Sequence, residues 1–283
     1  MTTFAIAGLQ LEIARGDNLA QLRSEIESVG SRFPWVQMVV LGELSVYGSG
    51  TARAEPPAGP TEQEFCRIAR ALNIWLLPGS LYVRDGDSVF NVTPVINPAG
   101  DVVARHRKMF PFLPYETGVA SGTDFVVFDV PSVGRFGVSN CYDMWFPETT
   151  RTLAAMGAEV ILHPSMTNTI DRDVELAIAR ANAAINQCYF LDINVAGRLG
   201  LGQSVVCGPG GEVVYQAGRG REIFPVEVDF DLVRRVRRRG WNCVGQVLKS
   251  FRDRAVDFPV CGDRSLEFEA LGSLGPLQLP QRD

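Results

Sequence analysis

The stretch from Gly134 to Ser165 reads GRFGVSNCYDMWFPETTRTLAAMGAEVILHPS. Its first apolar run ends at Cys141, and Pro147 and Glu148 then suit the first turn of a helix. A second apolar run begins at Val160 and predicts a buried strand. This strand–helix–strand order is typical of α/β proteins. The stretch therefore predicts the α/β class and places a thiol where a strand meets a helix.

The rest of the chain extends this pattern in both directions. Helices alternate with strands toward both ends, and the middle contains short strands joined by hairpin turns such as RDGD and PAGD. A capping-box pattern, TEQE, is expected to start the second helix at Thr61. We expect mixed sheets with helices on their outer faces. The expected helices are 18–33, 61–73, 147–156 and 171–187, and the first expected strands are 4–11, 36–44 and 74–83.

Composition and charge exclude several classes of protein. The chain has 283 residues and a net charge of −5, which does not favour binding to nucleic acid or to anionic membranes. It has no apolar run of about 20 residues and no basic leader, so we expect a cytoplasmic protein without a membrane anchor. The chain shows neither repeats nor a linker. We therefore expect a single domain over 1–283, with a C-terminal tail from about Asp231.

Cysteine and histidine usage bears on metals and redox state. The six cysteines are dispersed and form no CxxC motif, which favours free thiols in a reducing compartment. The two histidines, His106 and His163, share no metal-ligand spacing, so neither a metal nor another cofactor is expected. The tail begins with the arginine-rich run DLVRRVRRRG, residues 231–240. We interpret this run as a solvated or subunit-contacting helix end, because arginine is enriched at interfaces.

Cys141 has two readings from its local sequence. A buried cysteine is often an inert small hydrophobe, whereas a thiol at a helix N-terminus or beside a cation has its thiolate favoured. A nucleophilic thiol also needs a base. His163, after the next strand, is one candidate, and Glu43 is another because it closes a buried strand where desolvation raises a carboxylate pKa. Lys108 also closes a strand, so a carboxylate, an ammonium and a thiol could meet at one sheet edge.

Three motifs resemble those of the nitrilase superfamily of carbon–nitrogen hydrolases. They are LGELSVYG (41–48), HRKMFPF (106–112) and NCYDMWFPE (140–148), and the similarity runs from about residue 4 to residue 231. The resemblance implies that Glu43 is a general base, Lys108 stabilises an oxyanion and Cys141 is the nucleophile. Glu116, in FLPYETGVASG, stands about where many members carry a second carboxylate. It also implies a four-layer αββα sandwich with two mixed sheets, which usually forms homodimers or larger homo-oligomers.

Departures from the family motifs narrow the expected substrate. CYDMWFPE is typical of amide-cleaving branches rather than of nitrilases proper, and Trp145 stands where many members carry arginine. A short linear amide, cleaved to a carboxylic acid and ammonia through a thioester, is therefore our first expectation, and an N-carbamoyl amine or amino acid is the alternative. The expected pocket residues flank the triad segments in sequence: Tyr47, Tyr115, Tyr142, Trp145, His163 and Met166.

Other functions remain open on the sequence. A nitrilase is a less favoured alternative, as is a thioesterase that uses His163 as the base for Cys141. A binding protein that keeps the fold without catalysis is a further alternative, although all three triad residues are present. Transfer of the acyl group to an amine instead of water leaves no mark in the sequence.

Overall fold

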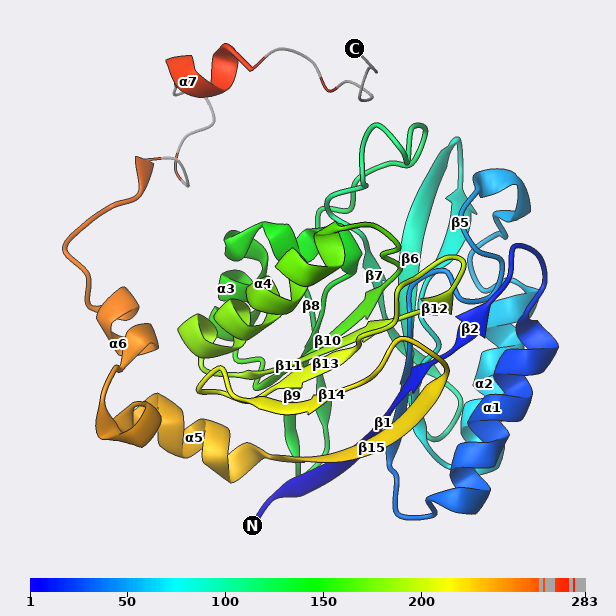
Figure 1. Cartoon of the computed structure of the whole chain (residues 1–283), viewed down its shortest axis with the longest axis horizontal. Helices are drawn as coiled ribbons and strands as arrows, with labels where there is room; N and C mark the ends of the chain where they lie inside the picture. The colour runs from blue at the N-terminus through cyan, green and yellow to red at the C-terminus, as the bar shows by residue number, and fades with distance from the viewer. Residues whose placement is uncertain (260–261, 263–267, 275–276, 278–283) are drawn as a thin grey trace.

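The structure is a computed structural model that describes residues 1–259, 262, 268–274 and 277. Two β-sheets face each other, and helices cover both outer faces (Figure 1). The first sheet has the order β15-β1-β3-β4-β6-β5, with β7 also paired to β6, and the second has the order β14-β13-β11-β10-β9-β8. Both sheets contain parallel and antiparallel pairs. The expected mixed sheets with helices outside are confirmed.

The element bounds are as follows. The first sheet contains β1 (Thr3–Gln10), β3 (Met38–Leu41), β4 (Trp75–Leu77), β5 (Leu81–Asp85), β6 (Ser88–Ile96), β7 (Val102–Arg107) and β15 (Glu222–Asp229). The second contains β8 (Val126–Val130), β9 (Gly134–Val138), β10 (Val160–Ser165), β11 (Tyr189–Asn194), β13 (Val205–Cys207) and β14 (Val213–Gln216), and the short strands β2 (Glu12–Ile13) and β12 (Ala196–Gly197) pair with each other. The helices are α1 (Leu19–Arg32), α2 (Pro60–Leu72), α3 (Pro147–Ala155), α4 (Asp171–Asn186), α5 (Phe230–Arg239), α6 (Val247–Arg252) and α7 (Glu269–Gly272), with single 3-10 turns at η1 (Thr51–Arg53), η2 (Cys141–Trp145) and η3 (Trp241–Cys243).

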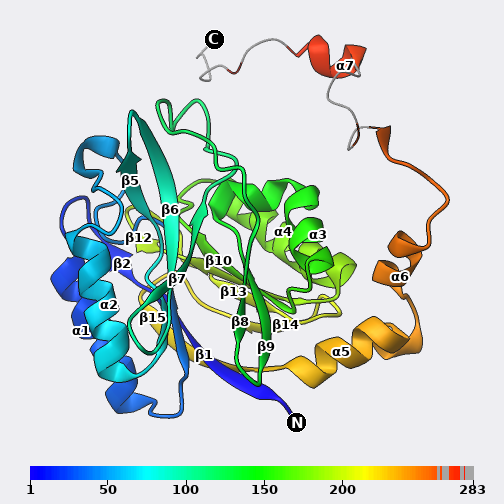
Figure 2. The same ribbon diagram turned by 180° about the vertical axis from the view of Figure 1, so that it is seen from behind.

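The central strands are buried on both faces, which explains their continuous apolar runs. In β1, Phe4 and Ile6 point into the core between the sheets, whereas Ala7 and Leu9 pack toward α1 and α2. This alternation follows from the two-residue period of a strand. The helices α1 and α2 cover the first sheet, and α3 and α4 cover the second (Figures 1 and 2).

Two local expectations are wrong. The helix α2 begins at Pro60 with Gly59 as its N-cap, so Thr61 lies inside the helix and forms no capping box. Its hydroxyl and backbone N–H instead donate to the Glu55 carboxylate, so the hydroxyl does not cap the helix. The expected strand 74–83 is broken into β4 and β5 at Gly79, whose φ is +79°. A Cβ at Gly79 would stand 1.9 Å from the carbonyl oxygen of Gly42, so only glycine fits beside the end of β3.

The arginine-rich segment forms α5, which follows β15. One face of α5 is apolar and packs into the core through Phe230 and Val233. Arg237 donates to backbone carbonyl oxygens, one of them that of Gln187 at 3.0 Å, and Arg234 pairs with Glu159 at 2.8 Å. These arginines thus bind groups of the protein itself. Among the residues that the structure describes, no helix is both long and apolar enough to cross a bilayer.

Candidate active site

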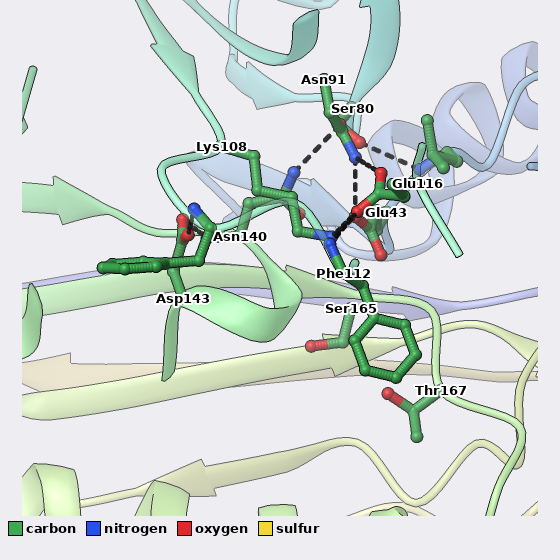
Figure 3. A network of polar contacts seen from close by, with 12 residues as sticks. Glu43, Ser80, Asn91, Lys108, Phe112, Glu116, Asn140, Asp143, Ser165 and Thr167 are labelled. Carbon is green, nitrogen blue, oxygen red and sulfur yellow. Dashed lines mark hydrogen bonds and ion pairs between the residues drawn. The ribbon is translucent and has the colours of Figure 1, made fainter. Parts of the chain in front are cut away.

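The site lies where several strands of both sheets end. Glu43 follows the end of β3, and its side chain is buried. Lys108 follows β7, and Glu116 lies in the loop between β7 and β8. The Lys108 Nζ donates to Glu43 Oε1 at 2.9 Å and to Glu116 Oε2 at 2.7 Å (Figure 3). The fold therefore brings together three charged residues that the sequence analysis selected, and it buries the ammonium almost completely, at 1% side-chain exposure.

Asn91 of β6 links both carboxylates to the segment that carries Cys141. Its Nδ2 donates to Glu43 Oε1 at 2.8 Å and to Glu116 Oε1 at 3.1 Å. Its Oδ1 accepts a hydrogen bond from Asn140 Nδ2 at 3.1 Å. One buried amide thus fixes the positions of two carboxylates and of the residue before Cys141 (Figure 3).

Cys141 begins the short 3-10 turn η2 after β9, in a left-handed conformation with φ of +48°. Such a backbone is uncommon for a residue other than glycine and is found at strained turns that expose nucleophiles. The half-buried thiol lies near the Glu43 carboxylate and the Lys108 ammonium, and both charges act on its pKa. The turn therefore places the sulfur in the same charged site as Glu43 and Lys108.

Asp143 anchors this turn to the lysine segment. Its carboxylate is fully buried and accepts hydrogen bonds from the backbone N–H groups of Asn140, Met109 and Phe110 at 3.0, 3.1 and 2.9 Å. His106 Nε2 lies 2.9 Å from the same carboxylate. The hydrogen bond from the Asn140 backbone N–H to the Asp143 side chain caps the start of η2. Asp143 thereby connects the nucleophile turn with the two residues that follow Lys108.

The pKa values of the two carboxylates move apart. Burial raises the pKa of Glu43 despite the attraction of Lys108. Burial acts in the same sense on Glu116, but Lys108 and the hydrogen bonds from Phe112 and Asn91 outweigh it and lower the pKa of Glu116. Burial opposes the charge of Lys108, but Glu43, Cys141 and Glu116 together raise its pKa well above the usual value. Glu43 is therefore the carboxylate suited to exchange a proton, while Glu116 and Lys108 keep their charges.

The thiol does not follow the expectation drawn from its place at a helix start. Burial and the nearby Glu43 charge raise the pKa of Cys141 well above its usual value, and Lys108 only partly opposes them. The turn η2 is five residues long and is not continuous with α3, so the favourable effect of a helix N-terminus is small. Cys141 is consequently a thiol at rest and needs a base to become a nucleophile.

A cavity of about 310 Å³ opens beside the sulfur of Cys141. Aromatic side chains line one part of it and polar side chains from the β10–α4 segment line the other. The lining residues are Phe112, Cys141, Tyr142, Trp145, Met166, Thr167, Asn168, Thr169, Asp171 and Glu175. This volume is at the small end of ligand-binding pockets and suits a small molecule.

Three of the six expected pocket residues, Tyr142, Trp145 and Met166, line this cavity, and the other three do not. The Tyr47 hydroxyl is bonded to Glu55 and Thr61, so its ring belongs to a separate small cavity. Tyr115 is 59% exposed and stacks on Phe112, outside the lining.

His163 is fully buried in β10, where its Nδ1 lies 2.6 Å from the Ser139 hydroxyl. Burial lowers the pKa of His163 to about 4. A histidine with such a pKa is a weak base at neutral pH, and the carboxylate that acts most strongly on the Cys141 thiol is that of Glu43. The geometry thus favours Glu43 over His163 as the partner of the thiol.

Several residues of the site were missed by the sequence analysis. Asn91 is a polar residue within the apolar strand SVFNVTPVI, and Asp143 stands three residues after Asn140. Both patterns are visible in the sequence and could have indicated a polar role at the site. Tyr82, whose hydroxyl donates to Glu116 at 2.9 Å, and Glu175, in the cavity wall, carried no such signal. Within the described residues no group of three His, Cys, Asp or Glu side chains is arranged to hold a metal ion.

Comparisons with known proteins agree with this architecture. A family model described as carbon-nitrogen hydrolase matches residues 4–238. An ω-amidase of Saccharomyces cerevisiae is 28% identical over 263 residues, which cover 82% of this chain and 89% of that protein. A formamidase of Bacillus cereus is 28% identical over 237 residues, covering 79% and 70% of the two chains.

Solved structures show the same fold. The crystal structure of Saccharomyces cerevisiae Nit3, a member of branch 10 of the nitrilase superfamily, has a TM-score of 0.77 and 28% sequence identity, with 84% of this chain and 94% of that chain covered. An amidase from Nesterenkonia sp. has a TM-score of 0.74 at 23% identity, with 82% and 92% covered. The expected αββα sandwich is confirmed. The chain therefore belongs to the carbon-nitrogen hydrolase family, on the amidase-like branch of the nitrilase superfamily, and is a hydrolase of carbon–nitrogen bonds other than peptide bonds.

Proposed function

We propose that this enzyme hydrolyses a small linear amide to a carboxylic acid and ammonia through a thioester on Cys141. The observation that carries the proposal is the position of the Lys108 ammonium between Glu43 at 2.9 Å and Glu116 at 2.7 Å, next to a thiol that lines a small cavity. The ω-amidase and formamidase relatives support amide hydrolysis in general. Amide cleavage needs a nucleophile, a base and an oxyanion-binding cation, and this group supplies all three.

The first half of the reaction forms the acyl-enzyme. Glu43 accepts the proton of the Cys141 thiol, and the sulfur forms a bond to the amide carbon. The negative charge that develops on the amide oxygen is held by the Lys108 ammonium and by the backbone N–H of Tyr142. Protonated Glu43 then transfers its proton to the nitrogen, the C–N bond breaks, and ammonia leaves.

The second half releases the acid. Glu43 removes a proton from a water molecule, and the resulting oxygen nucleophile attacks the thioester carbon. The C–S bond breaks, and the sulfur recovers a proton from Glu43. Glu116 keeps Lys108 charged and positioned in both halves, because its lowered pKa keeps it ionised.

An ammonia-release screen tests the proposal. The substrates are short aliphatic amides, ω-amides of dicarboxylates, N-carbamoyl amines and nitriles, and Cys141→Ala protein is the blank. We expect ammonia from at least one amide, and a mass increase on Cys141 equal to the acyl group after rapid quenching. Release from N-carbamoyl amines alone would favour the alternative substrate class, and activity that persists in Cys141→Ala would refute the mechanism.

We also propose that the chain is one domain that forms a homodimer or a larger homo-oligomer, with the segment from about Asp231 at the subunit contact. Apolar side chains are exposed on α4 and directly after α3, among them Ile185 at 38% and Met156 at 40%. In α5 the side chains of Arg238 and Arg239 are exposed. These surfaces have the mixture of apolar residues and arginine that is enriched at interfaces.

A further inference from the structure

The polar wall of the cavity carries an excess of negative charge. Glu175 and Asp171, both on α4, line the cavity, and no lysine or arginine is among the described residues that line it. Glu175 is held from two sides: its Oε1 accepts from the Thr167 hydroxyl at 2.9 Å, and its Oε2 accepts from Arg172 at 3.1 Å. The carboxylate is therefore fixed in place, and its oxygens retain lone pairs for a ligand.

The nearby cations do not neutralise this wall. Arg172 is buried and lies 2.6 Å from Asp192 as well as 3.1 Å from Glu175, so one positive charge faces two negative charges. Lys108, the other buried cation near the cavity, is likewise paired with two carboxylates. A ligand in this cavity therefore meets a net negative potential.

The N-terminus of α4 works in the opposite direction but is outweighed. A helix N-terminus resembles about half a positive charge and attracts anions. The first five residues of α4 include three carboxylates, Asp171, Asp173 and Glu175. The sum of these charges is negative, so the helix start does not form an anion site.

The aromatic part of the cavity also suits a cation. Phe112, Tyr142 and Trp145 line the cavity together with the acidic residues Asp171 and Glu175. Cationic groups are attracted to the faces of such rings, most strongly to tryptophan. An ammonium group in the cavity thus has both aromatic and carboxylate partners, while a carboxylate group has neither.

We propose that Glu175 makes the cavity selective for amides whose acyl chain ends in an ammonium group, over isosteric neutral chains and against chains that end in a carboxylate. This inference rests on the proposed amide hydrolysis and specifies its substrate class. The carboxylate accepts a hydrogen bond from the ammonium at the end of the acyl chain while the amide carbon lies at Cys141. Glu175 is accordingly a specificity residue.

The first test compares three amides of similar length on the wild-type enzyme at about pH 8, because burial and the Asp192 charge raise the pKa of Glu175 above the usual value of about 4.3. The substrates are 4-aminobutanamide, pentanamide and succinamate. Two unit charges about 6 Å apart in a partly buried site can change an equilibrium by up to about a hundredfold. We expect kcat/KM to fall about tenfold or more at each step from cation to neutral to anion. Succinamate turned over as well as 4-aminobutanamide would overturn the inference while leaving amide hydrolysis intact.

The second test uses a matched pair of variants on the same helix. Glu175→Gln removes the charge but keeps an oxygen for the Thr167 hydroxyl, whereas Asp173→Asn removes an equal charge from an exposed position outside the lining. The readout is the ratio of kcat/KM for 4-aminobutanamide to that for succinamate, which does not depend on total activity. We expect the ratio to fall at least about tenfold in Glu175→Gln and to stay within about twofold in Asp173→Asn. Equal ratios in Glu175→Gln and wild type would refute the role of Glu175.

A third measurement needs neither turnover nor a folded variant. Mass spectrometry follows the alkylation of Cys141 in the wild-type enzyme by iodoacetamide and by iodoacetate. The ratio of the iodoacetamide rate to the iodoacetate rate is then divided by the same ratio for glutathione, which corrects for the intrinsic reactivity of the two reagents. An acidic cavity predicts at least about a tenfold excess for iodoacetamide. If no amide releases ammonia, the proposed function fails, and an alkylation excess would then still show the acidic cavity. A corrected ratio near one would refute the acidic selectivity by itself.

Discussion

At the scale of single residues, the arrangement around Lys108 explains how two carboxylates take different roles. Glu43 is buried and Glu116 is mostly buried, and both contact the same ammonium. Glu116 also accepts hydrogen bonds from Phe112 and Tyr82, which stabilise its charge, whereas burial dominates for Glu43. The pKa values consequently separate, and Glu43 can take up a proton while Glu116, the other partner of Lys108, stays ionised.

The first prediction concerns Lys108. Removing one oxyanion donor typically costs about 2.7–4 kcal/mol of transition-state stabilisation. We expect Lys108→Ala to lower kcat at least about a hundredfold, and Lys108→Arg to fail as well, because a planar guanidinium cannot replace a compact ammonium between two carboxylates. Steady-state ammonia release measures the loss, and circular dichroism checks folding. Wild-type turnover in Lys108→Ala would show that the cation does not hold the oxyanion.

The second prediction separates activity from stability at Glu43. Its raised pKa means that ionised Glu43 is less favoured in the folded protein than in the unfolded chain, so its charge reduces stability above the unfolded pKa. We expect Glu43→Gln to abolish turnover but to keep or raise the melting temperature at neutral pH. The gain should disappear as pH falls below about 4.3, where Glu43 is protonated in both states. Thermal melts across this range test the sign, and a gain that grows at low pH would contradict it.

The raised pKa also predicts the acid limb of the wild-type pH profile. Glu43 must be ionised to accept the thiol proton, so kcat/KM should fall as pH drops through a value above about 4.3. The limb is measured with a neutral amide, which has no charge of its own to titrate. An acid limb at or below the ordinary glutamate pKa would argue against Glu43 as the base.

At the scale of secondary-structure elements, the short turn η2 depends on Asp143. Three backbone N–H groups and His106 share this one buried carboxylate, and two of those N–H groups follow Lys108. The turn therefore cannot move relative to the lysine segment without leaving buried donors unpaired. Asp143 acts through these contacts and is a positioning residue.

The third prediction follows from that anchor. Asp143→Asn replaces a carboxylate oxygen by an amide that cannot accept, so at least one buried N–H loses its partner, at a cost of about 1–3 kcal/mol. We expect a lower melting temperature. We also expect kcat to fall by a larger factor than KM changes, since the sulfur is displaced from Glu43. Asp129→Asn, at an exposed carboxylate paired with Arg135, is the control and should change neither. An unchanged Cys141 alkylation rate in Asp143→Asn would refute the positioning role.

At the scale of the whole molecule, the two sheets place their strand ends at one location. Glu43 follows β3 of the first sheet, and Cys141 follows β9 of the second. Side chains from both sheets thus meet although the two residues are far apart in the chain. The site depends on how the sheets pack, which is governed by the apolar core between them.

The fourth prediction concerns the proposed oligomer. Figure 2 shows α3 and α4 on the outer face of the second sheet, and exposed apolar side chains lie on α4 and at Met156, which directly follows α3. We expect light scattering to give at least twice the mass of one chain, and Ile185→Arg to shift the population toward monomer, because a buried charge without a partner is costly at an interface. Ala71→Arg, at an exposed site on α2 in the opposite helical layer, is the control. A monomeric wild-type chain would refute the proposal.

The amino-acid sequence by itself determined the class of the fold and the candidates for catalysis. Continuous apolar runs mark buried strands, and Glu43 and Cys141 stand where such runs end, whereas Lys108 follows the charged strand VVARHR. These are local features, set by the period and composition of short segments. Proline and glycine also predicted the starts of helices and the hairpin turns, although Thr61 was misread because its partner, Glu55, lies outside the helix that it was thought to cap.

Only the tertiary structure decided which of these residues meet and how they titrate. The pKa values of Glu43, Glu116 and Cys141 depend on burial and on distances to Lys108, which arise from contacts across many intervening residues. Contacts between distant segments also bring Asn91 to Glu43 and hold Tyr47 at Glu55, outside the cavity. Burial and distance depend on how the segments pack against one another. Local composition does not determine this packing, because each segment alone is compatible with many arrangements, and only the packing of the two sheets around one core selects among them.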